Sequence, residues 1–183
     1  MRAIAIVCLV STIILLTACG GGRCGDAKGA CPTEAIAVLQ PTKGNAVAGT
    51  VRFSQQGDDT LLIVAEVSGL SANGQHAFHV HEFGDASAPD AESAGGHYNP
   101  EGHAHGGPDS EERHAGDFGN LQADAQGKAR LELTARGVTV CGRNPVLGRS
   151  IIIHAKADDL STQPSGNAGP RIAIGVIGVA KAP

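Results

Sequence analysis

From residue 35 onward, short hydrophobic runs alternate with polar positions at the two-residue period of a half-buried strand. In the segment 129–134, for example, Ala, Leu and Leu alternate with Arg, Glu and Thr. The pattern predicts strands over 35–39, 47–54, 61–67, 75–81, 121–123, 128–134, 150–154 and 172–179, most of them separated by short turn segments. Because no run of ten or more residues has helical periodicity, we predict an all-β fold, an eight-stranded antiparallel barrel or sandwich.

Two stretches, 82–117 and 155–171, lack this alternation. Long segments without regular structure inside a compact domain usually carry function. The first stretch contains four histidines and few apolar residues. We therefore predict two long functional loops, and we expect metal coordination to order the first.

The N-terminus has the pattern of an export signal. Arg2 precedes a mostly apolar run, 3–16, which predicts a signal peptide over residues 1–18 and is too short for a comfortable transmembrane helix. The segment Leu16-Thr17-Ala18-Cys19-Gly20 resembles the lipobox of bacterial lipoproteins, where the signal is removed before an acylated cysteine. An ordinary signal peptide is the alternative. Residues 19–34 are glycine-rich and predict a lipidated linker ahead of a folded domain at 35–183.

This pattern predicts an exported protein of the periplasm or cell envelope, held at a membrane by a lipid anchor on Cys19. An oxidising compartment also permits disulfides. If Cys19 is acylated and Cys8 is removed, three thiols remain, at Cys24, Cys31 and Cys141. A Cys24–Cys31 bridge is one option, and a pairing of Cys141 with either partner stays open.

Charge and histidine content narrow the function. The net charge is −4 and no block of Lys or Arg occurs, so we expect no nucleic-acid partner. All eight histidines lie between His76 and His154, which a need for solubility alone does not explain. The clustering predicts metal binding.

Two of these histidines form the segment His79-Val80-His81 in a predicted strand. Residues i and i+2 of a strand share a face, so the two imidazoles leave the sheet together while Val80 points to the core. His114 and Asp117, three positions apart, offer an imidazole and a carboxylate. Such a donor set suits zinc or copper, whereas a calcium site would be built of oxygens.

Six segments carry a specific resemblance. They are Phe78-His79-Val80-His81-Glu82-Phe83-Gly84-Asp85, Gly96-His97-Tyr98-Asn99-Pro100, His105-Gly106-Gly107-Pro108, Glu112-Arg113-His114-Ala115-Gly116-Asp117, His154-Ala155-Lys156-Ala157-Asp158-Asp159 and Gly166-Asn167-Ala168-Gly169-Pro170-Arg171. Over about residues 36–180 the chain resembles the copper/zinc superoxide dismutase family. The resemblance implies a Greek-key barrel with one copper and one zinc ion per chain.

The resemblance also implies roles for individual residues. It implies copper ligands at His79, His81, His97 and His154, and zinc ligands at His97, His105, His114 and Asp117. His97 would be shared as a bridging imidazolate, and Asp158, outside both ligand sets, would link His79 to His105. The family spacing and the Gly-Gly-Pro that follows select His105 over His103, which we expect to be a solvated loop residue. His76 is left out of the ligands.

The implied reaction converts two superoxide anions and two protons into dioxygen and hydrogen peroxide, in defence of the cell envelope. Arg171 would attract the anion at the mouth of the copper site, and His97 would carry a proton. A non-catalytic copper-binding lipoprotein and a zinc-only barrel are the alternatives, and a homodimer stays open. The family disulfide is absent, because we place its positions at Ala86 and Ile174. We therefore expect the long loop to depend on zinc for its order.

Overall fold

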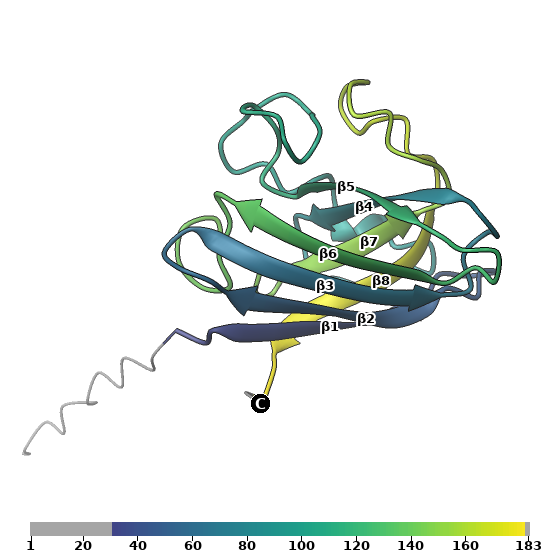
Figure 1. Cartoon of the computed structure of the whole chain (residues 1–183), viewed down its shortest axis with the longest axis horizontal. Coiled ribbons are helices and arrows are strands. Elements are labelled where there is room, and N and C mark those ends of the chain that lie inside the picture. The colour runs from purple at the N-terminus through teal and green to yellow at the C-terminus, as the bar shows by residue number, and fades with distance from the viewer. Residues whose placement is uncertain (1–30, 182–183) are drawn as a thin grey trace, which may run out of the picture.

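The computed structural model describes residues 31–181, and within them the fold is all-β, as predicted (Figure 1). Eight strands and one short 3-10 helix, η1, follow each other along the chain. They are β1 (Glu34–Pro41), β2 (Ala48–Gln55), β3 (Thr60–Ser68), β4 (Gln75–His81), η1 (Glu92–Ala94), β5 (Asp117–Gln122), β6 (Ala129–Arg136), β7 (Ser150–His154) and β8 (Arg171–Val179). Seven of the eight strands lie within about two residues of their predicted bounds at both ends.

The strands pair antiparallel in the order β5-β4-β7-β8-β1-β2-β3-β6 and curl into a nearly closed barrel (Figure 1). The chain crosses the barrel after β3, so that β4 pairs with β5 and β7, while β6 returns to the free side of β3. This crossing gives the Greek-key connectivity that the resemblance implied. It also separates a half made of β1, β2, β3 and β6 from a half that carries the histidines.

The core explains why the two halves differ. In β3 buried and less buried residues alternate, because one face packs on the core and the other meets solvent. In β4 and β7 nearly every residue is buried, because the two long loops cover the outer face. Val80 is fully buried in the core, while His79 and His81 on the opposite face are enclosed by the loops. The barrel thus holds the His-X-His pair between a hydrophobic core and a second, polar layer.

Strand β5 begins earlier than the alternation predicted, at Asp117 rather than at residue 121. Asp117 pairs with His79 across a register shift in the β4–β5 ladder. An irregularity of this kind re-aims a side chain next to a site. Its effect here is to bring a carboxylate beside the histidine pair, which a strict two-residue pattern could not indicate.

The two long loops, 82–116 and 155–170, rise on the β4–β5 side of the barrel (Figure 1). The first is fastened to the barrel at several points. The backbone N–H of Lys43 donates to Pro89 O at 2.8 Å, and the hydroxyl of Ser150 donates to Phe83 O at 2.8 Å. The loop is therefore attached at its start, and its histidines lie over β4.

The structure selects one of the disulfides that the sequence left open. Cys31 is bonded to Cys141, with a Cα–Cα distance of 5.6 Å and a sequence separation of 110 residues. The Cys24–Cys31 option is therefore wrong, because the start of β1 lies against the β6–β7 loop rather than against its own linker. Cys24 itself, like Cys19 and the predicted signal peptide, lies outside the described residues.

The two positions at which we place the absent family bridge, Ala86 and Ile174, do not belong to one buried cluster. Ala86 is exposed, whereas the loop residues that pack on Ile174 are Ala91 and Ala94, together with Ile152. The contact between the long loop and the last strand is thus a small buried apolar cluster. Within residues 31–181, no helix is long and apolar enough to cross a membrane.

Candidate metal centre

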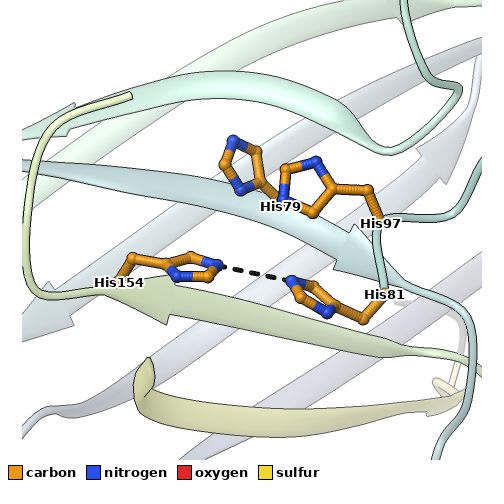
Figure 2. Close-up of side chains that lie close together, drawn as sticks. All are labelled: His79, His81, His97 and His154. Carbon is orange, nitrogen blue, oxygen red and sulfur yellow. Dashed lines mark hydrogen bonds between the residues drawn. The ribbon is translucent and has the colours of Figure 1, made fainter. Parts of the chain in front are cut away.

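Four histidines from three parts of the chain converge on one point. His79 and His81 come from β4, His154 ends the neighbouring strand β7, and His97 comes from the first long loop. Figure 2 shows the rings of His81 and His154 facing each other, with their Nε2 atoms 3.3 Å apart. One ring nitrogen from each of the four residues lies within 4.8 Å of the others, and all four side chains are buried.

The second nitrogen of each β-strand histidine is fixed by an acceptor. His79 Nε2 donates to Asp158 Oδ2 at 2.7 Å, His81 Nδ1 donates to Gly95 O at 3.0 Å, and His154 Nδ1 donates to Gly169 O at 3.0 Å. Because a neutral imidazole carries one proton, the nitrogen that faces the cluster is then unprotonated and offers its lone pair. Metal-binding histidines have this arrangement, since the outer hydrogen bond sets tautomer and ring orientation.

The electrostatics keep three of these rings neutral. Burial, together with the neighbouring rings, lowers the pKa of His97 to about 4 and that of His154 to about 3. The same causes hold the pKa of His81 well below its usual range. At neutral pH the side chains of His81, His97 and His154 are therefore neutral imidazoles.

Two buried nitrogens of this cluster, His79 Nδ1 and His97 Nε2, have no hydrogen-bond partner within the described chain. A buried polar atom without a partner is costly. Around an ion with bonds of about 2.0–2.1 Å, ligand atoms lie about 3–4 Å apart, which agrees with the 3.3 Å between His81 and His154. The residues present fit a bound cation, and an all-imidazole set suits copper, among other transition metals.

A second cluster adjoins the first. It contains His97, His105, His114 and Asp117, again with one ligand atom each inside 4.8 Å and all buried. The carboxylate oxygens of Asp117 lie 2.8 Å from His97 Nδ1, 3.0 Å from His105 Nδ1 and 3.2 Å from His114 Nδ1. Three imidazoles and one carboxylate in a closed setting are the donor set of a structural zinc site.

Asp117 is held for this position from two directions. The backbone N–H groups of Gly106 and His114 donate to its Oδ2 at 3.2 and 3.0 Å. Burial would raise the pKa of Asp117, but the hydrogen bonds from the surrounding histidines lower it far below its usual range. The carboxylate is thus an anion at every physiological pH, and it is placed to meet a cation.

His97 belongs to both clusters, with Nδ1 on the Asp117 side and Nε2 on the side of His79 and His81. Asp158 connects the same two clusters from behind. Its Oδ2 accepts from His79, and its Oδ1 accepts from His105 Nε2 at 2.9 Å. Burial works in the other direction, but hydrogen bonds to Asp117 and Asp158 raise the pKa of His105 to about 9. A proton thus occupies His105 Nδ1 in the absence of a metal, and a bound cation would replace it.

We call the four-histidine cluster copper-type and the cluster that contains Asp117 zinc-type. A cavity of about 560 Å³ opens above the copper-type cluster, lined among others by His81, His97, His154 and Arg171. The Arg171 guanidinium donates to Ala91 O at 2.5 Å and to Gly95 O at 2.7 Å. These two carbonyls fix the guanidinium at the cavity wall. Arg171 thus lies where the sequence analysis expected it, at the entrance to the four-histidine cluster.

The remaining histidines are separate from the clusters. The side chain of His103 is 37% exposed and faces Glu101, so the choice of His105 over His103 agrees with the geometry. His76 is buried, and its Nδ1 donates to His154 O at 2.9 Å, so it supports the backbone of a cluster residue.

The sequence analysis did not identify two supporting residues, Asn120 and Gln163, whose side-chain amides hold the second long loop. No sequence period indicates them.

The fold and the site together define a β-barrel metalloprotein in which an all-histidine cluster shares one imidazole with a structural-type zinc site. Comparison with known proteins agrees. The family model for copper/zinc superoxide dismutase matches residues 47–177. The chain is also 44% identical over 156 residues to "Superoxide dismutase [Cu-Zn]" of Paramecium bursaria Chlorella virus 1, which covers 82% of this chain and 80% of the viral protein.

The chain therefore belongs to the copper/zinc superoxide dismutase family. It is an oxidoreductase whose substrate is superoxide and whose cofactors are copper and zinc. The relationship favours the enzyme over the two alternatives, a copper-binding protein without activity and a zinc-only barrel.

Proposed function

We propose a specific division of the metal centre: copper is held by His79, His81, His97 and His154, and zinc by His97, His105, His114 and Asp117. The observation that carries the proposal is the orientation of the rings. In the strand histidines the outer nitrogen donates to a fixed oxygen, and the inner nitrogens of His79 and His97 face the cluster without a partner. His97 bridges because each of its nitrogens faces a different cluster.

Copper, when bound, supplies a redox couple that takes an electron from one superoxide anion and returns it to a second. The chain supplies the remaining parts. Arg171 attracts the anion and orients it with two parallel N–H groups, which is the geometry that a planar guanidinium offers to a small oxyanion. With zinc on Nδ1, His97 would hold a proton at Nε2 while that nitrogen is not a ligand, and would pass this proton to the peroxide, which takes its second proton from solvent.

The assignment is tested with His154→Ala in metal-loaded protein, and His103→Ala, an exposed loop histidine, serves as the matched control. The His154 variant is expected to bind less than a tenth of the copper, to keep its zinc and to lose superoxide dismutation to the uncatalysed background. The His103 variant is expected to match the parent protein. Full activity in the His154 variant would contradict the assignment.

We also propose that the enzyme works in the cell envelope, held at a membrane by acylated Cys19 after removal of residues 1–18. Support comes from the sequence pattern alone, with an apolar run that ends Leu16-Thr17-Ala18-Cys19-Gly20. Labelling with a radioactive fatty acid tests it in a bacterial host. The parent chain should incorporate label and fractionate with membranes, whereas Cys19→Ser should do neither.

We propose, finally, that the enzyme is a homodimer. Val38 on β1, Val176 on the adjacent strand β8 and Phe83 at the start of the long loop are 54%, 43% and 57% exposed. Exposed apolar groups on one face are typical of association surfaces. Sedimentation equilibrium of the parent chain and of Val176→Glu tests this. A dimer that the charge dissociates supports the proposal, and a monomeric parent contradicts it.

A further inference from the structure

The charge balance at the cavity mouth is unexpected for an enzyme with an anionic substrate. The cavity lining includes one guanidinium, Arg171, and two carboxylates, Glu82 and Glu92. The protein thus places more negative than positive side chains where superoxide must enter.

The two carboxylates differ in what they do. Glu82 accepts the backbone N–H of Gly96 at 2.9 Å and so helps to fold the long loop. The Glu92 side chain is 68% exposed, and within residues 31–181 its one polar contact is with Arg171, whose Nη2 lies 3.4 Å from Glu92 Oε2. Nothing in the described fold needs the Glu92 carboxylate for its shape.

Arg171 does not need Glu92 for its position either. Its guanidinium is held by Ala91 O and Gly95 O, and only 12% of its side chain is exposed. Two short hydrogen bonds to fixed carbonyls outweigh one exposed ion pair, whose contribution is small. Glu92 therefore affects the site through its charge rather than by orienting the arginine.

We propose that Glu92 is a specificity-determining residue that selects small monoanions over dianions at the mouth. Arg171 and a bound metal attract any anion, and they attract a dianion more strongly than a monoanion. A fixed negative charge beside Arg171 opposes this preference, since Coulomb repulsion doubles when the ligand charge doubles. Superoxide is a monoanion, whereas phosphate at mildly alkaline pH is mainly a dianion. Glu92 slows superoxide slightly and excludes phosphate more strongly.

The expected size follows from Coulomb's law. For a unit charge at about 7 Å in a water-like medium, removal of Glu92 should strengthen binding of a monoanion about two- to threefold. The same change should strengthen binding of a dianion about four- to ninefold, because the interaction energy doubles. Both gains should disappear at about 0.5 M salt, where the screening length falls below the separation of the charges.

The test uses the metal-loaded enzyme with Glu92→Gln, and Glu66→Gln on β3 is the matched control. Glu66 is also 68% exposed and also faces an arginine, Arg130, at 3.8 Å, but it does not line the cavity. Azide, a monoanion, is titrated through the visible absorption of copper. Phosphate at about pH 8 is titrated as a competitor of azide. Melting curves check that the variants fold equally well.

Glu92→Gln is expected to strengthen azide binding two- to threefold and phosphate binding four- to ninefold at low salt. The control Glu66→Gln is expected to bind both anions as the parent does. Glu92→Asp should behave like the parent. No gain, equal gains for the two anions, or gains that persist in high salt would overturn the proposal. Because it rests on the proposed role of Arg171, Arg171→Gln is measured in parallel. If that variant binds both anions as the parent does, the role of Arg171 fails separately.

Discussion

The copper-type and zinc-type clusters share an imidazole but are built in different ways. Three of the four copper-type histidines stand on the paired strands β4 and β7, and their outer nitrogens are fixed by hydrogen bonds. The zinc-type residues come from the loop 82–116 and from the first residue of β5. The paired strands thus hold the copper-type histidines in place, whereas the zinc-type residues lie mostly in a loop that has little hydrophobic core of its own. On the proposed assignment, we expect copper to bind a geometry that the strands already hold, and zinc to order the loop.

The largest expected effect is therefore that of zinc on stability. A ligand present at about a thousand times its Kd stabilises the folded state by about 4 kcal/mol, which for a chain of this size raises Tm by about 8–16 °C. Zinc added to metal-free protein should give a shift of this size in differential scanning calorimetry. Since copper meets a preset site, its structural effect on the loop, followed by amide hydrogen exchange over 98–116, should be smaller. Near-equal Tm values with and without zinc would contradict the comparison.

The next effect concerns the disulfide, whose cysteines belong to neither cluster. Cys31–Cys141 joins the start of β1 to the β6–β7 loop. Replacing both cysteines by serine should lower the free energy of unfolding by about 2–4 kcal/mol, because the bridge closes a long loop in the unfolded chain. Zinc and copper affinities should stay the same. Chemical denaturation measures the first quantity, and chelator competition measures the second. A change in either metal affinity would show that the two ends of the barrel are coupled.

The same contrast explains what the sequence could predict. The His-X-His pair was predictable because two residues of one strand share a face, whereas His154 was predicted through the resemblance. Asp117 was predicted as a site residue from its spacing to His114 and through the resemblance, but its place in β5 was not, since a register shift breaks the two-residue period. The Cys31–Cys141 pairing was one of the open options, but the sequence could not select it, because 110 residues separate the partners and only the closed barrel brings them together. The packing of Ala91 on Ile174 was not predicted, because no sequence period relates the long loop to the last strand.

A change at Asp158 should affect the two clusters alike. Its two oxygens accept from His79 and from His105, one residue of each cluster. In Asp158→Asn only one of the two positions can still accept, because the amide nitrogen donates. Loss of such an outer hydrogen bond lowers metal affinity about 10- to 100-fold. Chelator competition should show a weakening of copper and zinc together. Weakening of one metal alone would mean that the remaining amide oxygen serves a preferred partner, and that the clusters are less closely linked than the geometry suggests.

Gln163 should produce the smallest effect and the most selective one. Its amide meets the backbone of His105 at both ends: Oε1 accepts from His105 N at 2.8 Å, and Nε2 donates to His105 O at 2.9 Å. Gln163→Ala removes both hydrogen bonds, each worth about 1 kcal/mol. Zinc affinity should fall about 3- to 30-fold, while copper affinity stays within twofold, because no copper-type residue is supported by this amide. Gln163→Glu keeps the acceptor alone and should fall between the parent and the alanine variant.

Asn120→Ala provides the contrast that makes the Gln163 result informative. The Asn120 amide pairs in the same way with the backbone of Asp158, at 2.7 Å to its N–H and 2.9 Å to its carbonyl oxygen. Two equivalent amides thus hold one loop, but Asn120 supports the residue common to both clusters and Gln163 supports a zinc-type residue alone. Asn120→Ala should therefore weaken both metals and Gln163→Ala only zinc. If both variants lower copper and zinc affinity equally, the loop acts as one rigid body. Asn120 and Gln163 would then not support the two clusters separately.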